Sequence, residues 1–248
     1  MIMNGAPSGA VWLVGAGPGA ADLITVRGLA ALRSAEVVVH DRLISHDLLA
    51  EAPLNAERID VGKAPGAHRA TQEEIHNLLV HLAHLGKRIV RLKGGDPYVY
   101  GRGFEERDAL LAAGVECHVV PGLTAATAAA AEAGVPVTLR GVARTMGVFT
   151  PAVGAGEGLT DNDYVAAARL DTLCIYMGVR DLAEVSANLI AAGRAPDTPV
   201  AIVENGSMPN QRVTRGELAT IADVAAGRSI RPPALVIVGP TADGAVRI

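Results

Sequence analysis

The sequence predicts an α/β protein with two lobes, each built on a mainly parallel sheet with flanking helices. Short apolar runs alternate with stretches rich in Ala and Leu, which is typical of a parallel sheet covered by helices. Half of the 248 residues are hydrophobic and only 19% are charged, so a substantial core is expected. Pro121-Gly122 interrupts the alternation. We therefore expect a flexible tail over residues 1–10, one lobe over 11–120 and a second over 121–248.

In the first lobe, β-branched runs mark the strands, and Ala- and Leu-rich segments with helical spacing mark the helices. The expected strands cover residues 11–14, 36–40, 88–92 and 116–120. The expected helices cover residues 22–34, 73–85 and 104–113. A further short apolar run ends at Asp60-Val61.

The second lobe is expected to start with a helix over 124–133, for which Thr124 is a suitable N-cap. Its expected strands lie near residues 146–150, 172–177, 200–204 and 234–238. Its expected helices cover 181–192 and 218–226. Residues 151–159 hold many small side chains and are expected to form a flexible loop.

Composition excludes several classes of protein. The formal net charge of −4 argues against a general nucleic-acid binder. Cys117 and Cys174 are too few for a disulfide framework and favour a reducing, cytoplasmic setting. The seven histidines show no metal-ligand spacing, so no metal site is expected. No signal peptide and no membrane-length apolar run are evident.

The segment 91–103 carries the strongest indication of a ligand site. It follows a predicted buried strand and contains Gly94, Gly95 and Asp96, then Pro97 and the step Gly101-Arg102-Gly103. Glycines allow a ligand to approach the backbone closely, and ligands bind at the carboxyl ends of strands in open α/β sheets. The alternative is an ordinary loop between a strand and a helix.

A second glycine-rich loop, Gly15-Ala16-Gly17-Pro18-Gly19-Ala20, follows the first predicted strand. It fits the dinucleotide pattern G-x-G-x-x-G/A, and Asp41 ends the second strand where a ribose-binding acid would stand. This leaves an NAD-dependent oxidoreductase as an alternative. Pro18 counts against it, because proline has no amide to offer a pyrophosphate.

Ionisable side chains also follow the predicted strands. Asp41 and Lys63 are expected at strand ends on the ligand side of the sheet, where a carboxylate and an amine can move protons. A structural ion pair is the alternative. Cations occur in several loops and suit a ligand with many carboxylates. They are Lys63, His68, Arg69, Lys93, Arg102, Arg140 and Arg144.

Several motifs, in order along the chain, resemble the tetrapyrrole methylase family. They are Gly15-Ala16-Gly17-Pro18-Gly19, Asp41-Arg42-Leu43-Ile44-Ser45, Val61-Gly62-Lys63, Gln72-Glu73-Glu74-Ile75, residues 91–103, Pro121-Gly122-Leu123-Thr124-Ala125, Tyr176-Met177-Gly178 and Glu204-Asn205-Gly206. The resemblance covers residues 11 to about 240, nearly the whole chain.

The resemblance implies a two-lobed fold with S-adenosylmethionine bound in the cleft between the lobes, and a homodimer. It implies two successive methylations of ring carbons of uroporphyrinogen III to precorrin-2, with S-adenosylhomocysteine as the other product. Asp41 would be the proton acceptor and Lys63 the proton donor. Cofactor contacts would come from Pro18, Gly94, Gly95, Asp96, Val99, Thr124, Ala125, Met177 and Gly206. Substrate carboxylates would be bound by Arg42, Arg69, Arg102 and Arg140.

The chain also departs from the family pattern. Leu139 and Pro151-Ala152 replace histidine-containing motifs, Phe104 replaces a common glycine, and His40 replaces a common tyrosine. These changes leave open a methyltransferase of another corrin-pathway precorrin. A cofactor-binding relative without catalysis is a further alternative, although the intact Asp41, Lys63 and Asp96 count against it.

Overall fold

The computed structural model describes residues 9–62, 70–151 and 159–244. The chain divides into two compact units, Met1–Thr124 and Ala125–Ile248, and each is described by itself. The expected tail falls mostly outside the described residues, as does most of the expected loop over 151–159. Within the described ranges, no helix combines the length and apolar character needed to cross a membrane.

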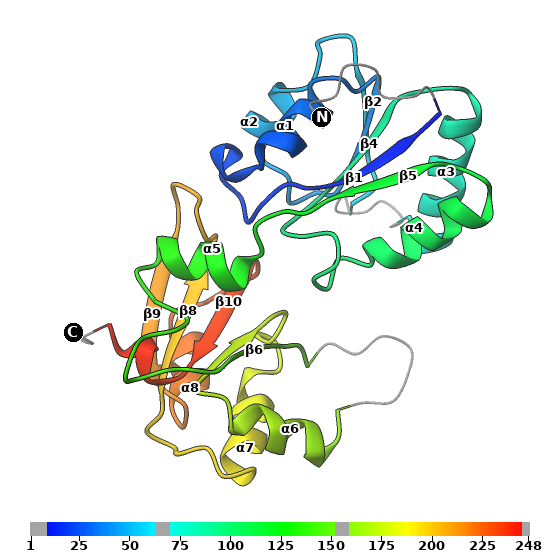
Figure 1. Cartoon of the computed structure of the whole chain (residues 1–248). Coiled ribbons are helices and arrows are strands. Elements are labelled where there is room, and N and C mark those ends of the chain that lie inside the picture. Colours follow the sequence, from blue (N-terminus) through cyan, green and yellow to red (C-terminus); the bar gives the residue numbers. More distant parts are fainter. Residues whose placement is uncertain (1–8, 63–69, 152–158, 245–248) are drawn as a thin grey trace. The chain divides into compact units, whose positions relative to one another are not determined.

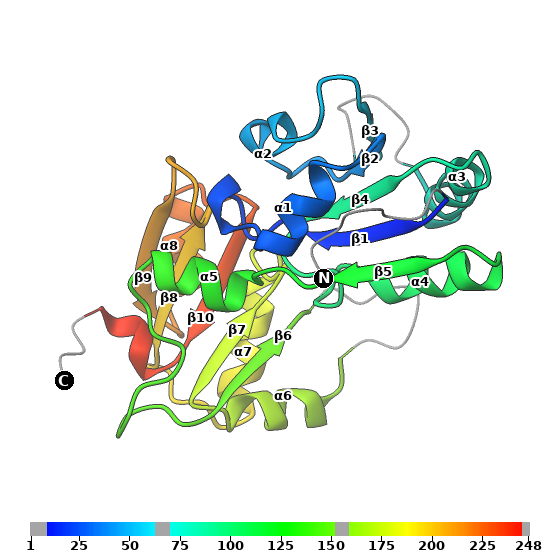
Figure 2. The same ribbon diagram turned by 45° about the horizontal axis from the view of Figure 1, so that its top comes forward.

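The first unit, coloured blue to green in Figure 1, is built on a five-stranded sheet with the strand order β3-β2-β4-β1-β5, whose strands are all labelled in Figure 2. All of its pairings are parallel. Its strands are β1 (Val11–Gly15), β2 (Val37–His40), β3 (Glu57–Asp60), β4 (Ile89–Lys93) and β5 (Cys117–Val120). The strands β2 and β4 are buried throughout. β2 appears in the sequence as a run of three valines, as expected of a strand covered on both faces, whereas β4 also contains Arg91 and Lys93.

Helices cover both faces of this sheet (Figure 2). On one face lie α1 (Val26–Leu32), which follows the short 3-10 helix η1 (Ala21–Leu23), and α2 (His46–Ala50). The opposite face carries α3 (Gln72–His84) and α4 (Gly103–Ala112). The helix predicted over 22–34 is therefore interrupted: Thr25 is extended and caps α1 by accepting a hydrogen bond from the Gly28 amide.

The second unit contains another five-stranded sheet, with the order β6-β7-β10-β8-β9. Its strands are β6 (Met146–Phe149), β7 (Thr172–Ile175), β8 (Pro199–Glu204), β9 (Arg212–Glu217) and β10 (Ala234–Val238). One face packs against α6 (Asp161–Ala168), α7 (Leu182–Ala191) and α8 (Ile221–Gly227). The other face packs against α5 (Ala125–Glu132) and the 3-10 helix η2 (Pro240–Asp243).

The predicted α/β class is confirmed, but the second sheet needs a correction. Only β6 and β7 are parallel, whereas the β7-β10, β10-β8 and β8-β9 pairs are antiparallel. The predicted strands do not include β9, which forms a hairpin with β8. A hairpin needs no crossover helix, so no helical segment separates β8 from β9. The alternation of strands and helices that predicts the other strands is therefore absent at β9.

Candidate active site

The carboxyl edge of the first sheet contains a topological switch point between β1 and β4. These strands are neighbours, yet β1 leads to α1 on one face and β4 leads to α4 on the other. In open α/β sheets, the crevice at such a point is where ligands bind. The two glycine-rich loops both start there.

The two loops are hydrogen-bonded to each other at this edge. Gly17 and Gly95 form an isolated antiparallel bridge, in which the Gly95 amide donates to Gly17 at 2.7 Å and the Gly17 amide donates to Gly95 at 3.2 Å. The Ala16 amide donates to the carbonyl of Lys93 at 2.8 Å. Two amides of the first loop are therefore already used within the protein. The Ala16 and Gly17 amides are therefore not available to donate hydrogen bonds to a pyrophosphate, and Pro18 has no amide hydrogen to donate.

Close packing requires glycine at two points of this edge, Gly15 and Gly122. A Cβ on Gly122 would stand 2.2 Å from the carbonyl oxygen of Gly95 and 2.7 Å from Cα of Gly15. By contrast, a Cβ on Gly94 or Gly95 would meet no atom within 4 Å. Gly15 and Gly122 thus hold the strand ends together, while Gly94 and Gly95 face open space that a ligand can fill.

Asp96 links the loops that follow β4 and β5. Its Oδ1 accepts a hydrogen bond from the Tyr98 amide at 2.8 Å, and its Oδ2 accepts one from the Gly122 amide at 3.0 Å. The Asp96 carbonyl accepts a longer bond from the Val99 amide at 3.3 Å. This carboxylate therefore shapes the loop in which Gly94 and Gly95 expose their backbone.

Asp41 follows β2 at the same edge, and its side chain is partly exposed. The Arg91 guanidinium donates from Nη2 to Oδ1 of Asp41 at 2.6 Å. Arg91 lies in β4 and is 2% exposed, whereas 38% of the Asp41 side chain is exposed. A fixed buried cation thus holds a carboxylate whose side chain reaches solvent.

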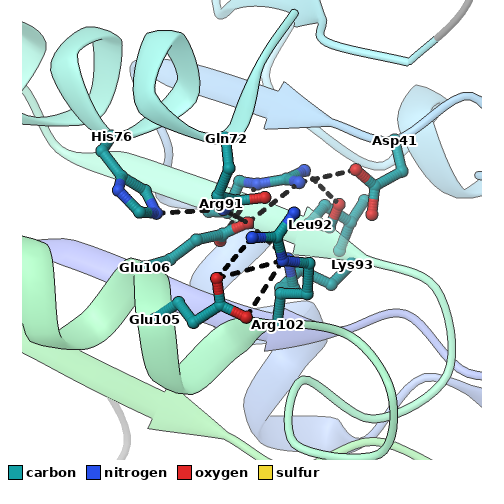
Figure 3. A network of polar contacts seen from close by, with 9 residues as sticks. All are labelled: Asp41, Gln72, His76, Arg91, Leu92, Lys93, Arg102, Glu105 and Glu106. Atoms are coloured by element: carbon teal, nitrogen blue, oxygen red, sulfur yellow. Dashed lines mark hydrogen bonds and ion pairs between the residues drawn. The ribbon is translucent and has the colours of Figure 1, made fainter. Parts of the chain in front are cut away.

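Arg91 belongs to a buried group of charges, shown in Figure 3. Glu106 on α4 is 1% exposed and lies between two cations of β4. Its Oε1 accepts from Lys93 Nζ at 2.6 Å, and its Oε2 stands 3.3 Å from Arg91 Nε. On α3, the Gln72 side chain donates to Oε1 of Glu106 at 3.2 Å and contacts His76 at 3.0 Å.

The pKa of Lys93 is lowered. Burial is the largest cause, and the neighbouring positive charge of Arg91 adds to it. The carboxylates of Glu106 and Asp41 act in the opposite direction and favour the charged amine. The protonation of Lys93 is therefore coupled to both acids.

Comparison with known proteins decides the family. Residues 10–222 match the family model of the tetrapyrrole (corrin/porphyrin) methylases. The chain belongs to the tetrapyrrole methylase family. The resemblance noted from the sequence motifs is thus confirmed.

Three members of this family are particularly similar. A protein of Methanosarcina barkeri described as an S-adenosyl-L-methionine-dependent uroporphyrinogen III methyltransferase is 44% identical over 93% of this chain and 91% of its own length. A siroheme synthase of Hydrogenovibrio crunogenus is 44% identical over 94% of this chain and 49% of its own length. The chain spans about half the length of the siroheme synthases that it matches.

The third is a solved structure. It is a uroporphyrin-III C-methyltransferase of Thermus thermophilus complexed with S-adenosyl homocysteine. The sequences are 36% identical, the TM-score is 0.82, and the match covers 96% of each chain. The fold of this tetrapyrrole methylase is therefore that of a structure known to hold the demethylated cofactor.

The predicted cofactor positions fall in both units. Pro18, Gly94, Gly95, Asp96 and Val99 gather in the two loops at the β1–β4 switch point, and Thr124 closes the first unit. Ala125, Met177 and Gly206 belong to the second unit.

In the second unit, short contacts connect the start of α5 with two strand ends. The Ala126 amide donates to the Tyr176 hydroxyl at 2.7 Å, which places the end of β7 beside α5. A Cβ on Gly206 would stand 2.4 Å from that of Ala129, so the segment after β8 packs closely on the same helix. Met177 has a positive φ of 54° and is 52% exposed. The positive φ strains the backbone of Met177, since only glycine adopts it easily. The Met177 side chain is accessible to solvent.

The predicted substrate-binding cations come from different segments of the chain. Arg42 directly follows Asp41, and Arg102 precedes α4 with a positive φ of 56° and is paired with Glu105. The Arg102 Nε donates to Glu105 at 3.0 Å. Arg140 is an exposed residue of the second unit. Lys63, Arg69 and Ala152 lie outside the described residues, so their assignments stay predictions.

Sequence reasoning missed the roles of Arg91, Lys93 and Glu106. Arg91 was seen only as the start of a glycine-rich segment, and Lys93 only as a loop cation. In fact Lys93 ends β4 and is 3% exposed, so Glu106 and not a ligand neutralises it. A signal was present: two cations inside a buried strand require buried acids nearby. In the described ranges, no group of three or more His, Cys, Asp or Glu side chains is arranged to hold a metal ion.

Proposed function

We propose that this chain transfers methyl groups from S-adenosylmethionine to two ring carbons of uroporphyrinogen III in succession, which gives precorrin-2 and S-adenosylhomocysteine. The observation that carries the proposal is the carboxyl edge of the first sheet. There, open glycine backbone at a switch point stands beside a carboxylate held by a buried arginine. The relatives described above support both the cofactor and the tetrapyrrole.

The cofactor is proposed to lie against the backbone of Gly94 and Gly95. The missing Cβ atoms leave room for it, and Asp96 fixes the loop by two backbone hydrogen bonds. Pro18, Val99, Thr124, Ala125, Met177 and Gly206 complete the proposed contacts. The sulfonium is itself a reactive methyl donor, so the protein mainly has to orient the reactants.

Asp41 is proposed as the proton acceptor. An electron-rich ring carbon attacks the methyl group, the carbon–sulfur bond breaks, and the ring carries positive charge until it loses a proton. A carboxylate that is held in place and yet partly exposed suits this task. Lys63 is proposed as the proton donor on the motif match alone.

The substrate carries acetate and propionate carboxylates around its ring. Arg42, Arg69, Arg102 and Arg140 are proposed to bind them, because a guanidinium matches a carboxylate in shape and charge. Arg102 uses Nε and Nη2 toward Glu105, so its Nη1 is the atom we assign to the substrate.

An NAD-dependent oxidoreductase is disfavoured by the same geometry. The Ala16 and Gly17 amides are used by carbonyls of the β4 segment, and Asp41 is paired with Arg91 instead of facing a ribose. We also propose that the protein acts as a homodimer in the cytoplasm. The two free cysteines are consistent with a reducing compartment.

The test is an anaerobic incubation of the protein with uroporphyrinogen III and S-adenosylmethionine labelled in the methyl group. We expect label in the tetrapyrrole and, after oxidation, the absorption spectrum of the precorrin-2 product. Tight binding of S-adenosylhomocysteine without any transfer would contradict the proposed substrate. Calorimetric binding of NAD in place of S-adenosylhomocysteine would contradict the class of enzyme.

A further inference from the structure

The proposed proton acceptor belongs to a group of four charges with a simple balance. Arg91 and Lys93 are buried cations on one strand, and Glu106 is the buried acid between them (Figure 3). These three groups together carry one positive charge in excess. Asp41, at 2.6 Å from Arg91, is the partly exposed acid that balances it.

Burial makes this balance consequential. The side chains of Arg91, Lys93 and Glu106 are at most 3% exposed, so water does not screen them. Leaving one of these buried charges without a partner would cost much free energy. Each of them is therefore strongly bound to the opposite charges next to it. Asp41 is the only one of the four whose side chain also reaches solvent to a large extent, at 38%.

Geometry also fixes the arginine itself. Nη1 of Arg91 donates to the carbonyl of Leu92 at 3.3 Å, and Nη2 is shared between Asp41 at 2.6 Å and Glu106 at 3.3 Å. Glu106 is held in turn by Lys93 and by Gln72 from α3. The guanidinium is thus held by α4 and by its own strand, and α3 supports it through Glu106.

We propose that Arg91 is a positioning residue for Asp41, and that Glu106 and Lys93 hold Arg91 in place as a charge-balanced pair. This inference rests on the proposed function, because it assigns to the three buried residues the task of orienting the proton acceptor. It predicts that catalysis depends on the balance of the group and not on each side chain separately.

The first experiment separates turnover from cofactor binding. In Arg91→Met, kcat is expected to fall by roughly 100-fold, the loss typical of a misplaced catalytic group. The affinity for S-adenosylhomocysteine, measured by calorimetry, is expected to stay within about twofold. Arg91→Lys restores a positive charge and is expected to recover part of kcat. Parallel losses of kcat and cofactor affinity, with no recovery in Arg91→Lys, would overturn the proposal.

The second experiment restores the balance without touching Arg91, and so it stands even if Arg91→Met does not fold. Glu106→Gln alone leaves two buried cations and is expected to lower kcat by about tenfold. The double variant Glu106→Gln/Lys93→Met returns the excess to one positive charge and is expected to come within about threefold of the unmodified protein. A double variant slower than Glu106→Gln would indicate purely structural roles and overturn the proposal.

A third readout needs no substrate, so it distinguishes failure of this inference from failure of the proposed function. The Lys93 amine is titrated by NMR in protein labelled at the lysine Cε. Asp41→Asn and Glu106→Gln each remove an acid that raises the pKa of Lys93, so both are expected to lower it further. Arg91→Met is expected to raise it.

The control for this titration is Glu51→Gln, which breaks the exposed pair between Arg33 and Glu51. It is expected to leave the pKa of Lys93 unchanged. If Asp41→Asn also leaves the Lys93 titration unchanged, Asp41 is not coupled to the buried group and the inference is wrong. If the titrations shift as expected while the unmodified protein methylates no tetrapyrrole, the coupling stands and the proposed function fails.

Discussion

At the scale of single residues, Gly94 and Gly122 show two different uses of glycine at one sheet edge. Gly122 is required by the fold, because any Cβ there would overlap the backbone of Gly95 and Gly15. Gly94 has open space instead, and its backbone does not require a positive φ. The fold alone therefore does not explain a glycine at position 94, whereas a bound ligand would.

Gly94→Ala should separate these two explanations. We expect the free energy of unfolding to change by less than ~0.5 kcal/mol, because the added methyl group meets no neighbour. We expect the affinity for S-adenosylhomocysteine to fall about tenfold or more, because the methyl group occupies ligand space.

The matched control is Gly227→Ala at the end of α8, which also adds a methyl group in open space. It should leave ligand affinity unchanged in calorimetry. Unaltered affinity in Gly94→Ala would remove Gly94 from the cofactor site.

At the scale of elements, α3 links local helix signals to the buried charges. Thr71 and Glu74 form a capping box: the Glu74 amide donates to the Thr71 hydroxyl at 3.1 Å, and the Thr71 amide donates to the Glu74 carboxylate at 2.6 Å. The cap fixes the first turn, which carries Gln72 toward Glu106.

Replacing the cap should therefore weaken the first unit. Thr71→Ala is expected to lower the free energy of unfolding by about 1 kcal/mol, the usual loss for an N-cap hydroxyl. Urea denaturation followed by circular dichroism measures this. Thr71→Ser keeps the hydroxyl and should lie close to the unmodified protein; equal losses in the two variants would show that the hydroxyl does not stabilise α3.

Elements with strong local patterns were predictable from the sequence. The buried strand β2 is marked by a run of three valines, β4 begins with a pair of β-branched residues, and α3 has amphipathic spacing and a cap. The strand β9 was missed because its charged residues, such as Arg212 and Glu217, lie on an exposed edge. Its antiparallel pairing with β8 depends on a hairpin rather than on periodicity. β10 is also antiparallel to both of its neighbours, so the second sheet is mixed.

The candidate site was predictable to the extent that it depends on glycine, aspartate and strand ends. The loops at Gly15 and Gly94 and the carboxylate of Asp41 were found because each directly follows a strand. The partnership of Arg91 with Glu106 was not found, because it joins a strand and a helix through side-chain packing that no local pattern encodes.

At the scale of the whole molecule, the two thiols, Cys174 buried and Cys117 partly buried, predict a loss of stability at alkaline pH. Burial raises the pKa of Cys117 to about 11 and that of Cys174 to about 12, from an ordinary value of 9.0. Above pH 9 the unfolded chain releases these protons while the folded chain retains them. The free energy of unfolding is therefore highest below this point and falls as pH rises toward the folded pKa values.

Cys174→Ala should make this decline less steep, by about 1.4 kcal/mol per pH unit in the interval where only the unfolded thiol is ionised. Lys93 acts in the opposite direction, since its lowered pKa makes the unfolded chain bind more protons, but its effect is the same in both proteins. Urea denaturation between pH 9 and about pH 11 provides the comparison. Identical slopes would show that Cys174 ionises in the folded protein as readily as in the unfolded one.

The whole molecule is proposed to bring a methyl donor and a tetrapyrrole to the edge where Asp41 stands. The most direct test is mass spectrometry of the tetrapyrrole after anaerobic turnover by the unmodified protein and by Asp41→Asn. The account predicts two added methyl groups per macrocycle with the unmodified protein, and at least ~100-fold slower addition with Asp41→Asn at unchanged affinity for S-adenosylhomocysteine. An unmethylated tetrapyrrole with the unmodified protein, or equal rates for the two proteins, would contradict it.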